Sequence, residues 1–323
     1  MLAREFSLLR SVRWDDAGKT TSGSVLGSAS DFTPLPQAAP QLALRGAWWQ
    51  AAVLAALLGW LYLPILSRLA SQWWHDPDFS HGFLVPLFSL FVLWRRRSQL
   101  SALRQAPSWW GVPVLLLALA MLVVGVLGAE LFFSRISLLV LIAGLVIFFL
   151  GWQQFRAVLF PLCFLVLMVP IPSILFNQIT LPLQMLASKA AASILALLGI
   201  PVLREGNIIQ LPAMALEVAR ACSGIRSLLT LLTIAIGYAF VRETRLWIRL
   251  ALALSAVPIA IAANSLRIVG TGLMVEYWSP EKAEGFFHLV SSWVVFGMSL
   301  ALLLLWHQLL RFTARGSAPC SHI

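Results

Sequence analysis

The chain contains eight apolar stretches, and most of them are long enough to cross a lipid bilayer as a helix. They lie at about 47–66, 82–94, 109–129, 131–151, 157–176, 222–241, 247–275 and 286–306. A helical span needs about 20 mainly apolar residues, because the hydrocarbon core is about 30 Å thick and a helix rises about 1.5 Å per residue. Backbone polar groups in that core must bond within their own segment. The sequence therefore predicts an all-α polytopic membrane protein with about eight transmembrane helices.

The composition leaves no room for a large soluble domain. Of the 323 residues, 60% are hydrophobic and only 11% are charged, and the mean hydropathy is +0.87. Residues 1–45 are rich in Ser, Gly, Pro and charged side chains, which is typical of a flexible tail. We interpret 1–45 as a flexible cytoplasmic tail, 46–308 as the transmembrane domain and 309–323 as a second cytoplasmic tail.

The formal charge of +10 comes mainly from arginines that cluster between the apolar stretches. In a soluble domain this charge would suggest a nucleic-acid partner, but here the spacing favours membrane topology as its cause, and we expect no nucleic acid. The arginines lie in every second loop and after the last span. They are Arg95, Arg96, Arg97 and Arg104 between spans two and three, Arg156 between spans four and five, Arg242, Arg245 and Arg249 between spans six and seven, and Arg311 and Arg315 after span eight. Because cytoplasmic loops are enriched in Lys and Arg, we expect these loops and both termini in the cytoplasm.

The stretch 183–202 is apolar enough to suggest a ninth span, but it contains Lys189 and many small residues. If it crossed the bilayer, the loop 242–249 would lie outside, against the pattern of all the other basic loops. We therefore predict an interfacial helix on the outer face. The alternation in 202–218 predicts a short extended hairpin that follows it.

Cysteine and histidine usage limits the possible chemistry. The three cysteines, Cys163, Cys222 and Cys320, show neither metal-ligand spacing nor a disulfide framework, and we expect no metal and no cofactor. A loop with two His and two Asp suggests either a divalent-metal site or a polar loop beside an interfacial Trp belt, and the second reading is the commoner one. The residues of this loop are His75, Asp76, Asp78 and His81.

Three ionisable side chains lie at or near the outer ends of three different spans. Cys222 begins the sixth span, Arg267 lies roughly 10–15 Å inside the seventh, and His288 begins the eighth. A thiolate, a guanidinium that stabilises an oxyanion and an imidazole that transfers a proton together suffice for acyl transfer. Other interpretations stay open: a small hydrophobic role for Cys222, and for Arg267 an ion pair with Glu217 or Glu276. His307 and His322 lie toward the opposite side.

Four segments of the chain resemble the exosortase/archaeosortase family. They are Asp78-Phe-Ser-His81-Gly-Phe-Leu-Val-Pro86, Leu216-Glu-Val-Ala-Arg220-Ala-Cys222-Ser-Gly-Ile-Arg226-Ser-Leu, Pro258-Ile-Ala-Ile-Ala-Ala-Asn264-Ser-Leu-Arg267-Ile, and His288 at the head of the last span. The resemblance covers about 76–305 and implies a multi-span cysteine transpeptidase of Gram-negative envelopes. The family's Cys, Arg and His fall on Cys222, Arg267 and His288. One departure is Ser292 before Trp293, where a Gly is expected.

The resemblance implies a specific reaction at the inner membrane. Such an enzyme cleaves the carboxy-terminal sorting signal, of the PEP-CTERM type, from exported proteins through a thioester and transfers them to an acceptor, with the active site facing the periplasm. We expect substrate contacts from Arg220, Arg226, Glu217 and Asn264. Expected partners are exported substrates, membrane lipids and an unknown acceptor nucleophile. The alternative function is a non-enzymatic carrier of lipid-linked sugar, or an assembly factor, in exopolysaccharide export.

Overall fold

The structure, a computed structural model, describes residues 44–128, 131–217, 224–278 and 286–316. From Ala56 onward the chain forms one compact unit, and every contact discussed below lies within it. Helices dominate the described residues. They are α1 (Leu44–His75), η2 (Pro77–Phe83), α2 (Leu84–Arg95), α3 (Arg97–Ala102), α4 (Gly111–Leu127), α5 (Leu131–Phe149), α6 (Trp152–Phe164), η3 (Leu165–Met168), α7 (Ser173–Leu197), α9 (Gly224–Arg242), α10 (Leu246–Tyr277) and α12 (Phe286–Gly316).

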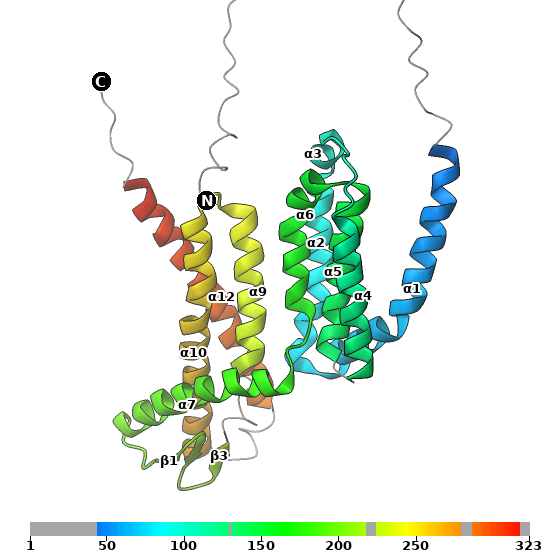
Figure 1. The fold of residues 1–323 in the computed structure, drawn as a ribbon. Coiled ribbons are helices and arrows are strands. Elements are labelled where there is room, and N and C mark those ends of the chain that lie inside the picture. Colours follow the sequence, from blue (N-terminus) through cyan, green and yellow to red (C-terminus); the bar gives the residue numbers. More distant parts are fainter. Residues whose placement is uncertain (1–43, 129–130, 218–223, 279–285, 317–323) are drawn as a thin grey trace, which may run out of the picture. The chain divides into compact units, whose positions relative to one another are not determined.

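Among the described residues, seven helical segments are long and apolar enough to cross a membrane. They are Ala52–His75, Pro77–Arg95, Leu131–Phe149, Ser173–Leu197, Ile225–Arg242, Leu246–Tyr277 and Trp293–Ala314, and two shorter apolar helices cover Gly111–Leu127 and Trp152–Met168. Of the seven, α7 runs crosswise to α9 and α10 at one end of these helices (Figure 1). Without α7, six of these segments remain. Together with the two shorter apolar helices they give eight spans, which agrees with the predicted number of about eight. The chain is a multi-pass, all-α membrane protein, as predicted.

The predicted boundary of the fifth span, 157–176, is wrong. The helix formed by α6 and η3 ends at Met168, and the extended residue Val169 follows it. Pro170 and Pro172 explain this ending, because proline lacks a backbone N–H and disfavours the helical conformation of the residue before it. The helix α7 then begins at Ser173, so the crosswise helix predicted over 183–202 starts earlier and ends at Leu197.

The predicted hairpin is confirmed, and a third strand extends it. Strands β1 (Leu203–Glu205), β2 (Ile208–Gln210) and β3 (Ala215–Glu217) form an antiparallel sheet in the order β1-β2-β3. Gly206 has φ +66°, the left-handed conformation that a tight turn between β1 and β2 requires. Ile209 is fully buried, in one apolar cluster with Leu195 of α7 and Ile268 of α10. The sheet therefore covers the place where α7 meets α10.

The helices α9, α10 and α12 pack against one another. Their shared core contains Leu231, Leu252 and Leu303, one from each helix, and all three are fully buried. A second core joins α1, α2, α5 and α6 through Leu69, Val85, Leu139 and Phe164. Burial of such side chains contributes about 1.5–3 kcal/mol each to stability in water, although in lipid the packing contacts between helices matter more.

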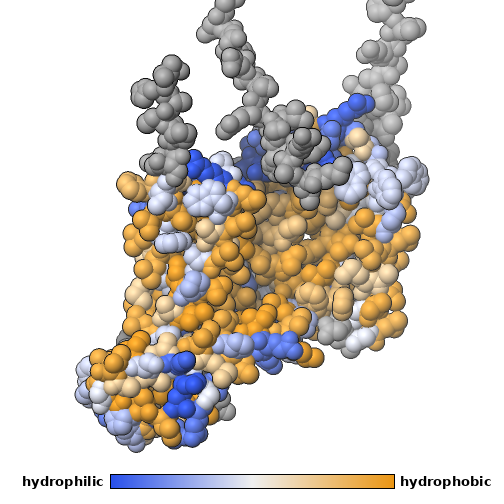
Figure 2. Space-filling view, turned by 60° about the vertical axis from the view of Figure 1, so that its left-hand side comes forward, coloured by the Kyte–Doolittle hydropathy of each residue, from blue (hydrophilic) through white to orange (hydrophobic). Residues whose placement is uncertain are grey.

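The basic loops gather at one end of the helices, opposite α7 (Figure 1). The guanidinium carbons of Arg96 and Arg249 lie 4.7 and 5.0 Å from the centre of the Phe240 ring. Arg245 donates a hydrogen bond of 3.0 Å to the carbonyl of Ala314, near the end of α12. We call this end the arginine end and the other the α7 end. Figure 2 shows an apolar belt between more hydrophilic ends on the face in view.

A buried polar network links α9 to α12 at the arginine end. His307 Nε2 lies 2.6 Å from Glu243 Oε1, and the Tyr238 hydroxyl lies 2.9 Å from His307 Nδ1. Arg311 Nε lies 3.3 Å from the same Glu243 oxygen. Glu243 is 8% and His307 2% exposed. His307 thus lies at the arginine end, and its described contacts are with this network.

Replacing Glu243 with Ala should lower the free energy of unfolding by about 3 kcal/mol, because removal of one member of a buried pair leaves the other polar groups without compensation. The measurement is reversible unfolding of the purified protein in mixed detergent micelles. Glu205→Ala serves as the control, since Glu205 is exposed on β1 and should change little. A Glu243→Ala protein that unfolds at the wild-type denaturant concentration would show that the network contributes no stability.

Candidate active site

The three residues predicted to be catalytic belong to α9, α10 and α12, the three helices that pack together. Arg267 lies within α10 and is fully described. Cys222 precedes Gly224, the first residue of α9, and lies outside the described residues. His288 is in the first turn of α12, but its side chain lies outside the described part. The same holds for Arg220 and for the side chain of Glu217 at the end of β3.

Arg267 is part of a buried polar stripe on α10. Asn264, Arg267 and Thr271 are 7%, 5% and 6% exposed. Their spacing of three and four residues places them on one face of the helix. Thr271 satisfies its own hydroxyl by donating a 3.0 Å hydrogen bond to the carbonyl of Arg267. Burying a guanidinium in a membrane helix is costly and usually marks a functional group.

The stripe lies near the α7 end of α10. Ile268, beside Arg267, packs in the same apolar cluster as Ala191 and Leu195 of α7. Glu276, one of two carboxylates considered as ion-pair partners for Arg267, is exposed and lies roughly 13 Å further along the helix axis. That separation rules out Glu276 as the direct partner of Arg267 and removes one of the structural interpretations.

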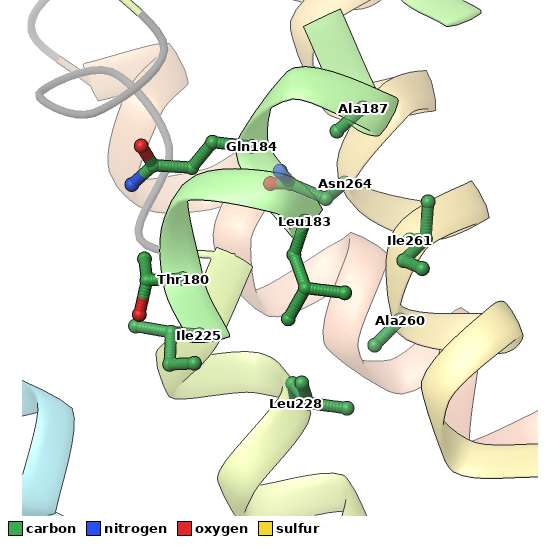
Figure 3. A pocket seen from close by; sticks show the side chains of 9 residues that line it. All are labelled: Thr180, Leu183, Gln184, Ala187, Ile225, Leu228, Ala260, Ile261 and Asn264. Atoms are coloured by element: carbon green, nitrogen blue, oxygen red, sulfur yellow. The ribbon is translucent and has the colours of Figure 1, made fainter. Parts of the chain in front are cut away.

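A narrow cavity of about 20 Å³ opens between α7, α9 and α10 (Figure 3). Its lining is mainly apolar, with three polar side chains from two helices. The lining residues are Thr180, Leu183, Gln184, Ala187, Ile225, Leu228, Ala260, Ile261 and Asn264. Asn264 points toward α7 in Figure 3. The cavity has room for little more than one water molecule, and it lies beside the polar stripe and the start of α9.

Arg226, in the first turn of α9, forms an ion pair with Asp78 of η2. Arg226 Nε lies 3.3 Å from Asp78 Oδ1, and the side chains are 44% and 28% exposed. The turn that holds Asp78 is fixed by Asp76, whose carboxylate accepts a 3.0 Å hydrogen bond from the Asp78 backbone N–H. From the sequence, Asp78 was considered only as a metal ligand or as part of a polar loop, and its pairing with Arg226 was not predicted. The place of Asp78 in the first family-like segment is the signal that could have predicted a role.

The His75–His81 loop holds its histidines apart. The His75 ring nitrogen Nδ1 lies 2.9 Å from the carbonyl of Ser71, whereas His81 Nε2 lies 3.2 Å from the carbonyl of Leu167. Within the described chain, no three His, Cys, Asp or Glu side chains come close enough to hold a metal ion. The described contacts of this loop are structural: they join η2 to η3 and to α9.

A family model for transmembrane exosortases matches residues 73–305, more than two thirds of the chain. The chain belongs to the transmembrane exosortase family. No curated protein and no solved structure matches it. The match begins at the end of α1 and runs into α12, so the exosortase region includes the Asp78–Arg226 pair, the polar stripe of α10 and the small cavity. It agrees with the region of about 76–305 inferred from the sequence and shows an exosortase-type membrane function.

Proposed function

We propose that this exosortase is a membrane-embedded cysteine transpeptidase for exported proteins that carry a carboxy-terminal sorting signal of the PEP-CTERM type. The observation that carries the proposal is the buried guanidinium of Arg267 at the α7 end of α10. It stands on a helix that packs against the two helices at whose ends Cys222 and His288 lie in the sequence. A buried cation in a membrane helix often marks a functional site, and acyl transfer is a reaction that would use it.

The reaction proceeds in two steps, formation of a thioester and its aminolysis. The Cys222 thiol gives its proton to His288, and the thiolate attacks the scissile carbonyl to form a tetrahedral oxyanion. Collapse of this intermediate breaks the peptide C–N bond, and His288 protonates the departing amine. The client is then held as a thioester. An acceptor amine attacks that thioester, loses a proton to His288 and releases the Cys222 thiol.

Arg267 donates hydrogen bonds to the oxyanion in this scheme. Its burial places the charge where water does not screen it, so its interaction with a developing negative charge is stronger than in water. The planar fork of a guanidinium also fixes the direction of its N–H groups, which a lysine ammonium does not.

The substrate contacts are proposed around this centre. Asn264 lines the cavity between α7, α9 and α10, and its amide can bind the backbone of the recognition motif. Arg226 is 44% exposed, so a substrate carboxylate can replace Asp78 as its partner. We assign Arg220 and Glu217 to the same surface. The client's own transmembrane helix approaches from the side of α9, α10 and α12.

The proposed orientation follows from the arginine end. Arg96, Arg245 and Arg249 gather there, and the enrichment of Lys and Arg in cytoplasmic loops assigns that end to the cytoplasm. The α7 end, with the catalytic centre, then faces the periplasm at the inner membrane. Exported clients reach this face after translocation, and both termini lie in the cytoplasm.

The decisive experiment traps the thioester. The purified protein in lipid nanodiscs is mixed with a client that ends in the tripartite signal, without an amine acceptor, and is quenched in acid. Mass spectrometry should find the amino-terminal client fragment linked to the peptide that contains Cys222, and hydroxylamine should release it. Client cleavage without such an adduct, or an adduct at Cys163 or Cys320 instead, would refute the mechanism.

A further inference from the structure

Arg135 is a buried cation that the proposed reaction does not use. It lies one helical turn inside α5 from Leu131 and is only 4% exposed. Within the described chain, its Nε is fully buried and has no hydrogen-bond partner. A guanidinium in a membrane helix is costly unless an anion or other acceptor compensates it. Among the described residues no carboxylate pairs with this guanidinium, so an anion from outside the chain can compensate its charge.

A polar cavity of about 600 Å³ lies beside Arg135, between the last turns of α1 and the first turn of α5. Arg135 and Arg68 both line it, and Asp76 is the only carboxylate among the lining residues that the structure describes. Asp76 is engaged as the cap of η2, where it accepts the hydrogen bond from the Asp78 N–H. Among the described lining residues, two guanidiniums and one carboxylate leave one net positive charge, which is complementary to the single negative charge of a phosphodiester. The other lining residues are Ser67, Ser71, Gln72, His75 and Leu131.

An apolar groove of about 760 Å³ continues from this polar cavity toward the middle of the helices. The two spaces share Arg68 and Leu131 in their linings. Leu61 and Ile65 of α1 form one wall of the groove, and the other wall comes from α4 and α5. The Tyr62 hydroxyl lies 3.0 Å from Ser137 Oγ and holds α1 against α5 beside it. Such a volume is within the range of about 300–1,000 Å³ typical of ligand pockets.

We propose that this space binds an anionic glycerophospholipid from the leaflet at the α7 end. The phosphodiester lies between Arg135 and Arg68, where charge-assisted hydrogen bonds from two guanidiniums can reach it. An acyl chain fills the groove between α1 and α4. A free phosphate would need only the polar cavity, whereas a lipid needs both the polar cavity for its headgroup and the apolar groove for an acyl chain. The presence of both therefore favours a lipid. The site is independent of the reaction at Cys222.

The test is native mass spectrometry of the full-length protein with phosphatidylglycerol, phosphatidylcholine and sn-glycerol 3-phosphate as probes. We expect phosphatidylglycerol to bind at least about fivefold more tightly than the zwitterionic lipid. Arg135→Gln should weaken its binding about tenfold or more. Arg156→Gln, a change at an exposed arginine of α6, is the matched control and should leave binding unchanged.

A second variant tests the groove without changing any charge. Val123 is 47% exposed and lines the groove, so Val123→Trp should block the acyl chain and weaken phosphatidylglycerol but leave glycerol phosphate unaffected. If Arg135→Gln fails to fold, the Val123→Trp variant still tests whether the groove binds an acyl chain. Equal binding of both lipids, undiminished binding to Val123→Trp, or glycerol phosphate that binds as well as the lipid would each overturn the proposal.

Discussion

Replacing Cys222 with Ala should abolish cleavage of the sorting signal, with a loss of roughly 10⁴-fold or more in kcat, as is typical when a catalytic nucleophile is removed. Without sulfur no thioester forms, and the buried guanidinium of Arg267 has no intermediate to stabilise. The measurement is the rate of client cleavage by protein in nanodiscs, followed by the appearance of the shortened client. Cys222→Ser should be nearly as inactive, because a hydroxyl is far less acidic than a thiol.

Cys163→Ala is the matched control for this change. Cys163 is a free thiol exposed on α6, outside the proposed catalytic set, and its removal should leave the rate near that of the wild type. The same pair of variants tests the alternative of a carrier of lipid-linked sugar. A carrier needs no thiol, so a Cys222→Ala protein with full activity in the cell would favour it and would end the case for a transpeptidase.

Arg267→Lys should lower kcat by about 10²–10³-fold, the usual cost of losing one donor from an oxyanion site. Lysine keeps the charge but loses the planar fork that directs two N–H groups at one oxygen. Because the contact strengthens only in the transition state, KM should change little while kcat falls. Steady-state kinetics in nanodiscs over a range of client concentrations separate the two constants.

Arg226→Lys provides the comparison. Its side chain is 44% exposed and pairs with Asp78, so we expect a modest change that appears mainly in KM. A thermal unfolding measurement on both variants separates loss of activity from loss of structure. Wild-type kcat in a folded Arg267→Lys protein would remove the oxyanion role from this residue and leave it a structural one.

Hydropathy alone predicted the helical membrane fold but not where all of its helices end. The stretch 157–176 is apolar throughout, yet its helix ends at Met168, because the backbone restrictions of Pro170 and Pro172 outweigh hydrophobicity. The first span shows the opposite error. It was predicted to end near residue 66, but α1 continues to His75, since a helix that reaches the membrane surface can extend into its polar boundary.

The residues of the candidate site could be proposed from the sequence because they stand out by type within apolar stretches. Arg267 is buried in α10, as a charged residue in such a stretch suggests. The partners of such residues are not visible in sequence: Arg226 and Asp78 are 148 residues apart, and His307 and Glu243 are 64 apart. Arg135 was missed although it lies within the predicted span 131–151. A search for every charged residue inside a span would have identified it.

The small volume of the cavity between α7, α9 and α10 has a consequence for the proposed reaction. A space of about 20 Å³ admits a solvent molecule but no polypeptide, so no client segment fits beside Asn264 in the described arrangement of α7, α9 and α10. The proposed binding of a recognition motif to Asn264 therefore requires α7 to move away from α9 and α10, and a client that is anchored by its own membrane segment would stay long enough to meet that opening. Such latency would guard a reactive acyl intermediate against premature hydrolysis and spare passing proteins that lack an anchor.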